Sequence, residues 1–119
     1  METILASSSY RSQKSLNDVL HLERMAFAAK TRAARAVLGL SQRRFAELIG
    51  LTQKSVHRIE HGAVDPSMRT VVRIETFWRA NGVRFEETPD AGFRLIVDAA
   101  VLRAISVEPE QDFAGQRPS

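Results

Sequence analysis

The segment Ser41–Gly62, SQRRFAELIGLTQKSVHRIEHG, predicts two short helices that cross at a steep angle over a tight turn. Ser41 and Thr52 are suited to cap the two helices, because their hydroxyls accept hydrogen bonds from free backbone N–H groups in the first turn. Gly50 supplies the positive φ that the turn requires. A small residue is needed where the helices touch, and Ala46 stands at that position.

Apolar side chains in this segment fall on the inward face of both helices. The first helix, residues 42–49, and the second, residues 53–61, each contribute two of them, and one more follows the turn and fills the gap. This pattern is typical of helices that bury one face against a common core. The five residues are Phe45, Ile49, Leu51, Val56 and Ile59.

Helical periodicity continues on both sides of this pair. Leu16–Leu38 lacks Gly and Pro and repeats apolar residues at three- and four-residue steps, which predicts one long helix or two in series. Gly39 ends it. Ser67–Ala80 predicts a fourth helix, in which we interpret Phe77 and Trp78 as core residues and not as platforms for stacked bases.

After Gly82 the apolar period changes from near 3.6 to 2. Two alternating runs, VRFEE and FRLIV, flank the turn sequence TPDAG at residues 88–92, which predicts a β-hairpin. Ile96 interrupts the alternation, so both faces of the second strand are expected to meet other groups. Residues 98–107 fit either a short capped helix or a continuing strand. The predicted fold is mainly α, a helix-turn-helix bundle with a C-terminal β-hairpin.

Four segments follow from these patterns. Residues 1–15 are Ser-rich and polar without a period, and we expect them to form a flexible N-terminal arm. Residues 16–82 form the helical domain, and residues 83–107 form the hairpin segment. Residues 108–119 are expected to be a flexible tail.

Composition excludes several classes of protein. The chain has no cysteine, so disulfides, thiol catalysis and cysteine-bound zinc are excluded. No apolar run approaches the roughly 20 residues of a membrane helix. Arg24–Arg58 contains eight basic residues and one acidic residue, a net charge of +7, whereas Val83–Ser119 carries −3. A basic segment of this kind predicts one face that contacts a polyanion.

The crossed pair and its neighbours resemble the phage-repressor and Cro type of helix-turn-helix, also called the xenobiotic-response-element type. The resemblance covers about Arg32–Asn81 and implies a helical bundle, in which the hairpin here takes the place of the family's fifth helix. It also implies a structural ion pair between Arg35, in the helix before the crossed pair, and Glu60, in the second helix of the pair. The matching positions include Arg35, Ser41, Gln42, Ala46, Gly50, Thr52, Gln53, Val56, Ile59, Glu60 and Gly62.

The resemblance places the second helix of the pair in the major groove of double-stranded DNA. Gln53, Lys54 and Arg58 are expected to read base edges, because Gln pairs bidentately with adenine and Arg or Lys with guanine. Further groove-facing residues are Thr52, Ser55 and His57. At the start of the first helix, a phosphate would be held by Gln42, Arg43 and Arg44.

The stretch HRIEH, His57–His61, also matches the H-x-x-E-H signature of a zinc peptidase. That site needs a third ligand, and the remaining histidine, His21, lies in the N-terminal segment. A metal-dependent hydrolase therefore ranks last, and we expect no enzyme, catalytic residue, metal or cofactor. His61 is interpreted as a helix C-terminal residue favoured by the helix dipole.

We expect a sequence-specific transcriptional regulator, a repressor, that acts in the cytoplasm on the nucleoid as a homodimer bound to a palindromic operator. Dimerisation is assigned to the segment at residues 83–107, and the contact residues in its second strand are Phe93, Leu95, Ile96 and Val97. The alternative for the apolar residues 98–105 is that they fold back as a helix over the fourth helix of their own chain. The alternative is the antitoxin of a toxin–antitoxin pair, which binds a protein partner through its C-terminal segment as well as its own promoter.

Overall fold

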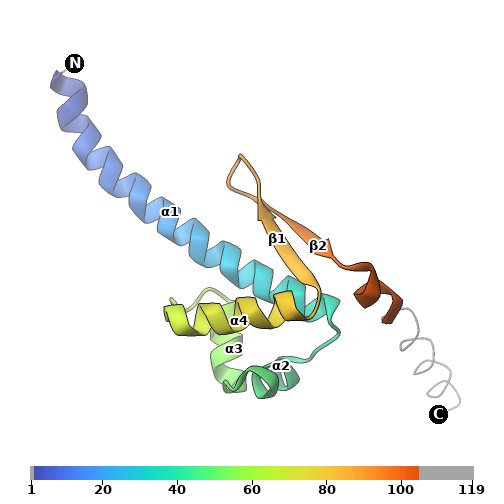
Figure 1. Ribbon diagram of the computed structural model, residues 1–119. Helices are drawn as coiled ribbons and strands as arrows, with labels where there is room; N and C mark the ends of the chain where they lie inside the picture. The colour runs from blue at the N-terminus through green and yellow to red at the C-terminus, as the bar shows by residue number, and fades with distance from the viewer. Residues whose placement is uncertain (1, 105–119) are drawn as a thin grey trace, which may run out of the picture.

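A computed structural model describes residues 2–104 of the chain, with side chains described from residue 15 (Figure 1). The helix α1 is followed by three shorter helices and by the antiparallel strands of one hairpin. The elements are α1 (Glu2–Val37), α2 (Gln42–Ile49), α3 (Gln53–Glu60), α4 (Met68–Ala80), β1 (Val83–Glu87) and β2 (Phe93–Val97). The mainly helical fold with a C-terminal hairpin is confirmed, and the expected tail at 108–119 lies outside the described residues.

The N-terminal segment differs from its prediction. Residues 1–15 were expected to form a flexible arm, whereas α1 is one continuous helix from Glu2 onwards. The physical reason is that neither Gly nor Pro occurs between Glu2 and Val37, so nothing interrupts the helix. Adding a residue to an existing helix is far cheaper than nucleating a new one.

The short helices begin at capped residues. The hydroxyls of Ser41, Thr52 and Ser67 accept hydrogen bonds from the backbone N–H three residues further on, at 3.0, 3.0 and 3.2 Å. Gly50 ends α2 with φ of +73°, so the chain turns directly into α3. Arg73 of α4 donates a hydrogen bond to the carbonyl oxygen of Ile49 at 3.2 Å, which satisfies one of the free carbonyls at this helix end.

The core lies where α3 and α4 pack against the C-terminal half of α1 and where α2 packs against α3 and α4. Trp78 is only 3% exposed and contacts the rings of Phe27 and Phe85, at centroid distances of 5.8 and 4.9 Å. Phe77 packs edge-on against buried Phe45 at 5.4 Å. Both α4 aromatics therefore serve the core. The fully or nearly buried apolar residues are Ala28, Ala34, Phe45, Ala46, Ile49, Val56, Ile59, Ile74, Trp78 and Val83.

The hairpin packs on the helices through β1. Val83 pairs with Val97 and Phe85 with Leu95, so these four side chains share the face that turns towards α1 and α4. Ile96 lies on the other face, where it pairs with Arg84. Burial therefore does not alternate along β2, because Leu95 on the inner face is exposed and Ile96 on the outer face is half-buried.

The open choice for the residues after β2 is settled in favour of a helix. Residues 99–104 are helical, and the backbone N–H of Val101 donates to the carbonyl oxygen of Asp98 at 3.0 Å. Val101 packs so closely on Gly82 that a Cβ there would lie 2.5 Å from its methyl carbon. The chain therefore folds back over the end of α4.

Candidate nucleic-acid interface

The helix α3 divides into a buried and an exposed side. Val56, Ile59 and Glu60 face the core at 0–5% exposure. Thr52 is held by its hydrogen bond to the hydroxyl of Ser55 at 2.9 Å. The exposed side carries the predicted groove-facing residues Thr52, Gln53, Lys54, His57 and Arg58, beside half-buried Ser55. The structure brings Gln53, Lys54, His57 and Arg58 together on the exposed side of α3, with Thr52 and Ser55 at its N-terminal end.

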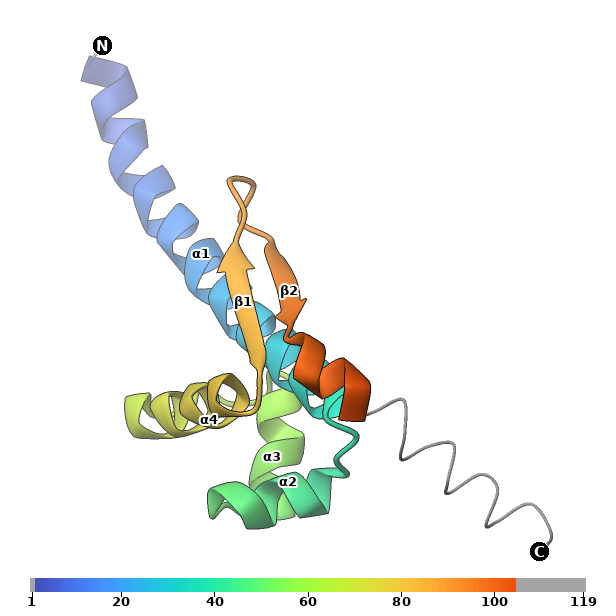
Figure 2. The same cartoon turned by 45° about the vertical axis from the view of Figure 1, so that its right-hand side comes forward.

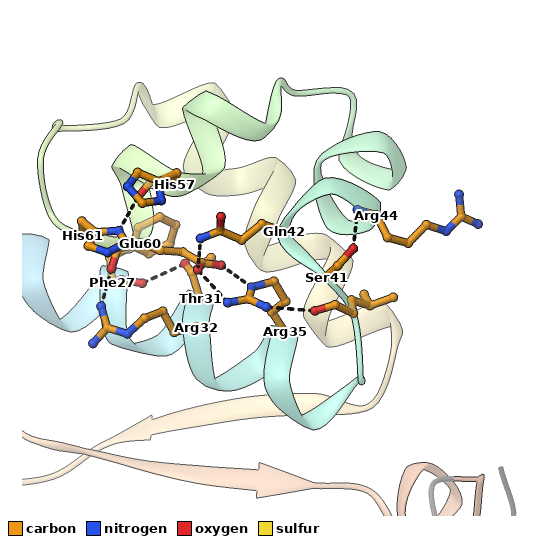
Figure 3. Close-up of polar contacts among 11 residues, drawn as sticks. Phe27, Thr31, Arg32, Arg35, Ser41, Gln42, Arg44, His57, Glu60 and His61 are labelled. Atoms are coloured by element: carbon orange, nitrogen blue, oxygen red, sulfur yellow. Dashed lines mark hydrogen bonds and ion pairs between the residues drawn. The ribbon is translucent and has the colours of Figure 1, made fainter. Parts of the chain in front are cut away.

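The orientation of α3 is held by a buried carboxylate at its C-terminal end (Figure 3). The Nε of Arg35 donates to Glu60 Oε2 at 2.7 Å, and its Nη2 donates to Oε1 at 3.0 Å. This hydrogen bonding with Glu60 raises the pKa of Arg35 above its ordinary value. The same guanidinium donates to the carbonyl oxygen of Leu40 at 2.9 Å, so it also fixes the connection between α1 and α2.

Two further side chains complete this network, and their roles were not predicted. Gln42 Nε2 donates to Glu60 Oε1 at 3.0 Å, which ties the start of α2 to the end of α3. Arg32 donates to the backbone carbonyl oxygen of Glu60. Arg32 and Arg35 are three residues apart and so lie on the same face of α1, and this spacing could have predicted that Arg32 also contacts Glu60. The contact of Gln42 depends on the crossing of α2 and α3 and left no local signal.

The placement of Gln42 changes its predicted role. Its amide group was expected to hold a phosphate, but in the structure this group is engaged with Glu60. Exposed Arg43 and Arg44 flank it, and Arg44 lies 3.4 Å from Glu47 on the next turn. The start of α2 therefore presents two guanidinium groups, together with the free backbone N–H groups of the helix.

The histidines of the HRIEH stretch lie close together without forming a metal site. The rings of His57 and His61 are 4.0 Å apart, and the Nδ1 of His61 lies 2.8 Å from the carbonyl oxygen of His57. Glu60, which stands between them in the sequence, is buried and its carboxylate accepts hydrogen bonds from Arg35 and Gln42, so it is not positioned as a base for water. Within the described part of the chain, no three His, Asp or Glu side chains could hold a metal together.

The predicted dimer residues lie away from α3. The hairpin and the pair α2–α3 occupy opposite sides of the body in both views (Figures 1 and 2). Leu95 is 41% exposed, and Phe93, Ile96 and Val97 are half-buried. The far edge of β2 has no strand beside it among the described residues. A contact through this edge would therefore leave the exposed side of α3 accessible.

The geometry of α1 to α4 is that of a capped, glycine-linked helix pair held by a buried Arg–Glu contact. Residues 32–77 match the family model described as Helix-turn-helix. This segment is a helix-turn-helix domain of the phage-repressor and Cro type. The helix-turn-helix domain makes the protein a DNA-binding regulator of transcription, with double-stranded DNA as its ligand. No curated protein matches the sequence of the chain. None of the described helices of this helix-turn-helix protein is long and apolar enough to span a membrane.

Proposed function

We propose that the protein is a repressor that reads a palindromic operator through α3, as a homodimer, on the nucleoid of the cell. The observation that carries this proposal is the division of α3. Its inner side is held by Glu60 and the core, while Gln53, Lys54, His57 and Arg58 are exposed on its outer side. A rigid helix with a polar outer face is suited to entry into the major groove.

Base reading is assigned to three long polar side chains. Gln53 at the first residue of α3 would pair with adenine, and Lys54 and Arg58, one turn apart, would pair with guanine. Thr52, Ser55 and His57 complete the groove-facing surface. Each bidentate contact contributes about 1–3 kcal/mol of discrimination against a wrong base.

Phosphate binding is assigned to the start of α2. Arg43 and Arg44 supply the charge, and the free N–H groups of the first turn supply directed donors. Because the amide of Gln42 is engaged with Glu60, we assign its phosphate contact to the backbone N–H and not to the side chain. Contacts of this kind fix the register of the protein on the duplex and carry no sequence information themselves.

Dimerisation supports tight binding, because α3 has eight residues and one helix of this length contacts few base pairs. We assign the dimer contact to the free edge of β2, with Phe93, Leu95, Ile96 and Val97 as its residues. An unpaired strand edge offers backbone donors and acceptors to a second copy. Pairing of this kind would set the two α3 helices about 34 Å apart, one turn of DNA.

Selection of bound DNA from a random pool tests this function. The full-length chain should enrich a palindrome whose half-sites lie about 10 base pairs apart, centre to centre. A matched Gln53→Ala/Arg58→Ala protein, selected in parallel, should enrich no site or a degenerate one. An enriched site without two-fold symmetry would contradict the dimer, and no enrichment by the wild-type chain would contradict sequence-specific binding. The antitoxin alternative assigned partner binding to the C-terminal tail at residues 108–119, which lies outside the described residues.

A further inference from the structure

Two histidines lie against each other at the C-terminal end of α3 (Figure 3). The rings of His57 and His61 are 4.0 Å apart, and both side chains are exposed. Residues four apart on a helix share one face, so His61 continues the line that runs from Gln53 through His57. His61 therefore stands beside a residue that faces the groove in the proposed complex with DNA.

A hydrogen bond fixes which ring nitrogen of His61 can contact a ligand. Its Nδ1 lies 2.8 Å from the carbonyl oxygen of His57. A carbonyl oxygen only accepts hydrogen bonds, so Nδ1 carries a hydrogen and the neutral ring has its lone pair on Nε2. Neutral His61 presents an acceptor at Nε2, whereas protonated His61 presents a donor and a positive charge there. Only the protonated ring can therefore bind an anion through Nε2.

The length of α3 places His61 beside the DNA backbone when Gln53 reaches the bases. The two residues are eight positions apart, which corresponds to about 12 Å along a helix axis. The major groove is also about 12 Å wide. A helix that enters the groove with its N-terminal residues at the base edges therefore has its C-terminal end at the wall of the groove, where the phosphates lie.

Carboxylates on the elements around the two histidines have arginines beside them. Glu60 accepts hydrogen bonds from Arg35, and Asp65 shares a pocket with Arg24. Among the described residues, no ion pair joins either imidazole to a carboxylate. An anion that neutralises protonated His61 therefore comes from a ligand. The charged residues of α3, of the facing part of α1, of α2 and of the loop after α3 are Arg24, Lys30, Arg32, Arg35, Arg43, Arg44, Glu47, Lys54, Arg58, Glu60 and Asp65.

We propose that His61 is a proton-gated contact for a DNA phosphate, which strengthens DNA binding as the pH falls. This inference rests on the proposed entry of α3 into the major groove. Imidazoles titrate near pH 6.5, where every backbone phosphate of DNA is anionic. The phosphate stabilises the charged ring, so the complex holds the proton more tightly than the free protein does. The contact is therefore fully present at acidic pH and is lost as the pH rises and the bound ring loses its proton.

Fluorescence anisotropy of the full-length chain with a duplex of arbitrary sequence tests the contact, because phosphate contacts do not depend on sequence. The wild-type chain should bind about five- to tenfold more tightly at about pH 6 than at about pH 8, the effect of a phosphate that holds the proton about one pH unit more tightly. His61→Gln keeps a neutral donor at both pH values and should lose most of this difference. His61→Arg keeps the charge and should bind at the higher pH as tightly as the wild-type chain does at the lower pH.

The matched control is His21→Gln, which removes the histidine of α1 and should keep the wild-type pH dependence. A pH dependence of His61→Gln equal to that of the wild type overturns the proposal, as does a wild-type affinity that is the same at both pH values. Failure of this contact is distinguishable from failure of the proposed function, because a chain without the contact still binds the duplex. A chain that binds no DNA at either pH refutes both.

Neutral phosphates give a second readout that leaves the protein unchanged. In the operator obtained by selection, single phosphates are replaced in turn by uncharged methylphosphonates. Replacement of the phosphate that His61 contacts should abolish the pH dependence, and replacement of distant phosphates should retain it. If every substituted operator keeps the pH dependence of the unmodified one, the proton is not held by a DNA phosphate and the proposal is wrong.

Discussion

Arg35 of α1 holds the carboxylate of Glu60 of α3 through two hydrogen bonds, at 2.7 and 3.0 Å. The Glu60 side chain is 1% exposed, whereas that of Arg35 is 22% exposed. The carboxylate has no access to water, so its charge is stabilised by Arg35 and by the amide of Gln42. This relationship couples the stability of the domain to the orientation of the helix that reads DNA.

Removal of Glu60 is the most direct test of that coupling. Glu60→Ala leaves the guanidinium of Arg35 without its partner and should lower the free energy of unfolding by about 3–5 kcal/mol. The control Glu47→Ala removes an exposed carboxylate 3.4 Å from Arg44 and should change it by less than about 1 kcal/mol. Thermal melts followed by circular dichroism measure both. Equal melting temperatures for the two variants would refute the structural role of the pair.

Base reading by α3 predicts losses that depend on the DNA sequence. Gln53→Ala and Arg58→Ala should each weaken binding to the best operator by about 1–3 kcal/mol, because each removes a bidentate contact with one base. For each variant, the preference for the correct base should relax at one base pair in each half-site. Fluorescence anisotropy with single-base operator variants measures this. If Gln53→Ala leaves affinity and preference unchanged, another element occupies the groove.

Phosphate binding by α2 predicts losses of affinity that do not depend on the DNA sequence. Arg43→Ala should weaken binding to all sequences alike and reduce the slope of log K against log salt by about one unit. The control is Arg84→Ala, which removes an equally exposed arginine from β1, distant from α3. Titrations at several salt concentrations compare the two. A salt slope for Arg43→Ala that matches the wild-type slope would remove α2 from the interface.

The β2 contact is best tested by a point variant. Truncation after Gly82 would remove Val83, which is fully buried, and would expose the core. Hydrogen bonds link Asp98 to Gly82 and Thr88 to Gly92, and the antiparallel alternation then leaves the N–H of Leu95 on the free edge.

Leu95→Pro removes that donor and should therefore separate the two copies. Light scattering should show half of the wild-type mass, and a full palindrome should bind no better than a half-site. The control Leu95→Thr keeps the N–H and loses only the apolar side chain, so it should weaken the assembly less than Leu95→Pro does. A proline variant with wild-type mass would place the dimer contact elsewhere.

The turn between α2 and α3 predicts a backbone effect on stability. Gly50→Ala forces a Cβ into φ of +73° and should cost about 1–2 kcal/mol of unfolding free energy. Crowding adds little, since the nearest atom to such a Cβ, on Arg73, lies 3.5 Å away. Gly50→Asn should cost less, because Asn tolerates the left-handed region. Urea denaturation of both variants checks the order, and equal costs would point to a steric cause.

The helix-turn-helix was predictable from the sequence because its determinants are local. Caps at Ser41 and Thr52, the glycine at position 50 and the apolar spacing act within one or two helical turns, so their consequences can be read without knowledge of the rest of the chain. The hairpin was predictable for the same reason, since its two alternating strands and the turn residues between them follow one another directly in the sequence.

Features that depend on distant contacts were decided by the tertiary structure. The sequence alone could not show that Gln42 turns its amide towards Glu60, because their contact exists only where α2 crosses α3. It also favoured a polar, flexible segment before residue 16, whereas α1 continues to Glu2. The polar composition of residues 1–15 indicates that they are exposed to water. It does not show whether they are helical, because a segment joined to an existing helix can extend that helix without the cost of nucleation. Which apolar residues remain uncovered, as Leu20 does, is set by where the other helices end.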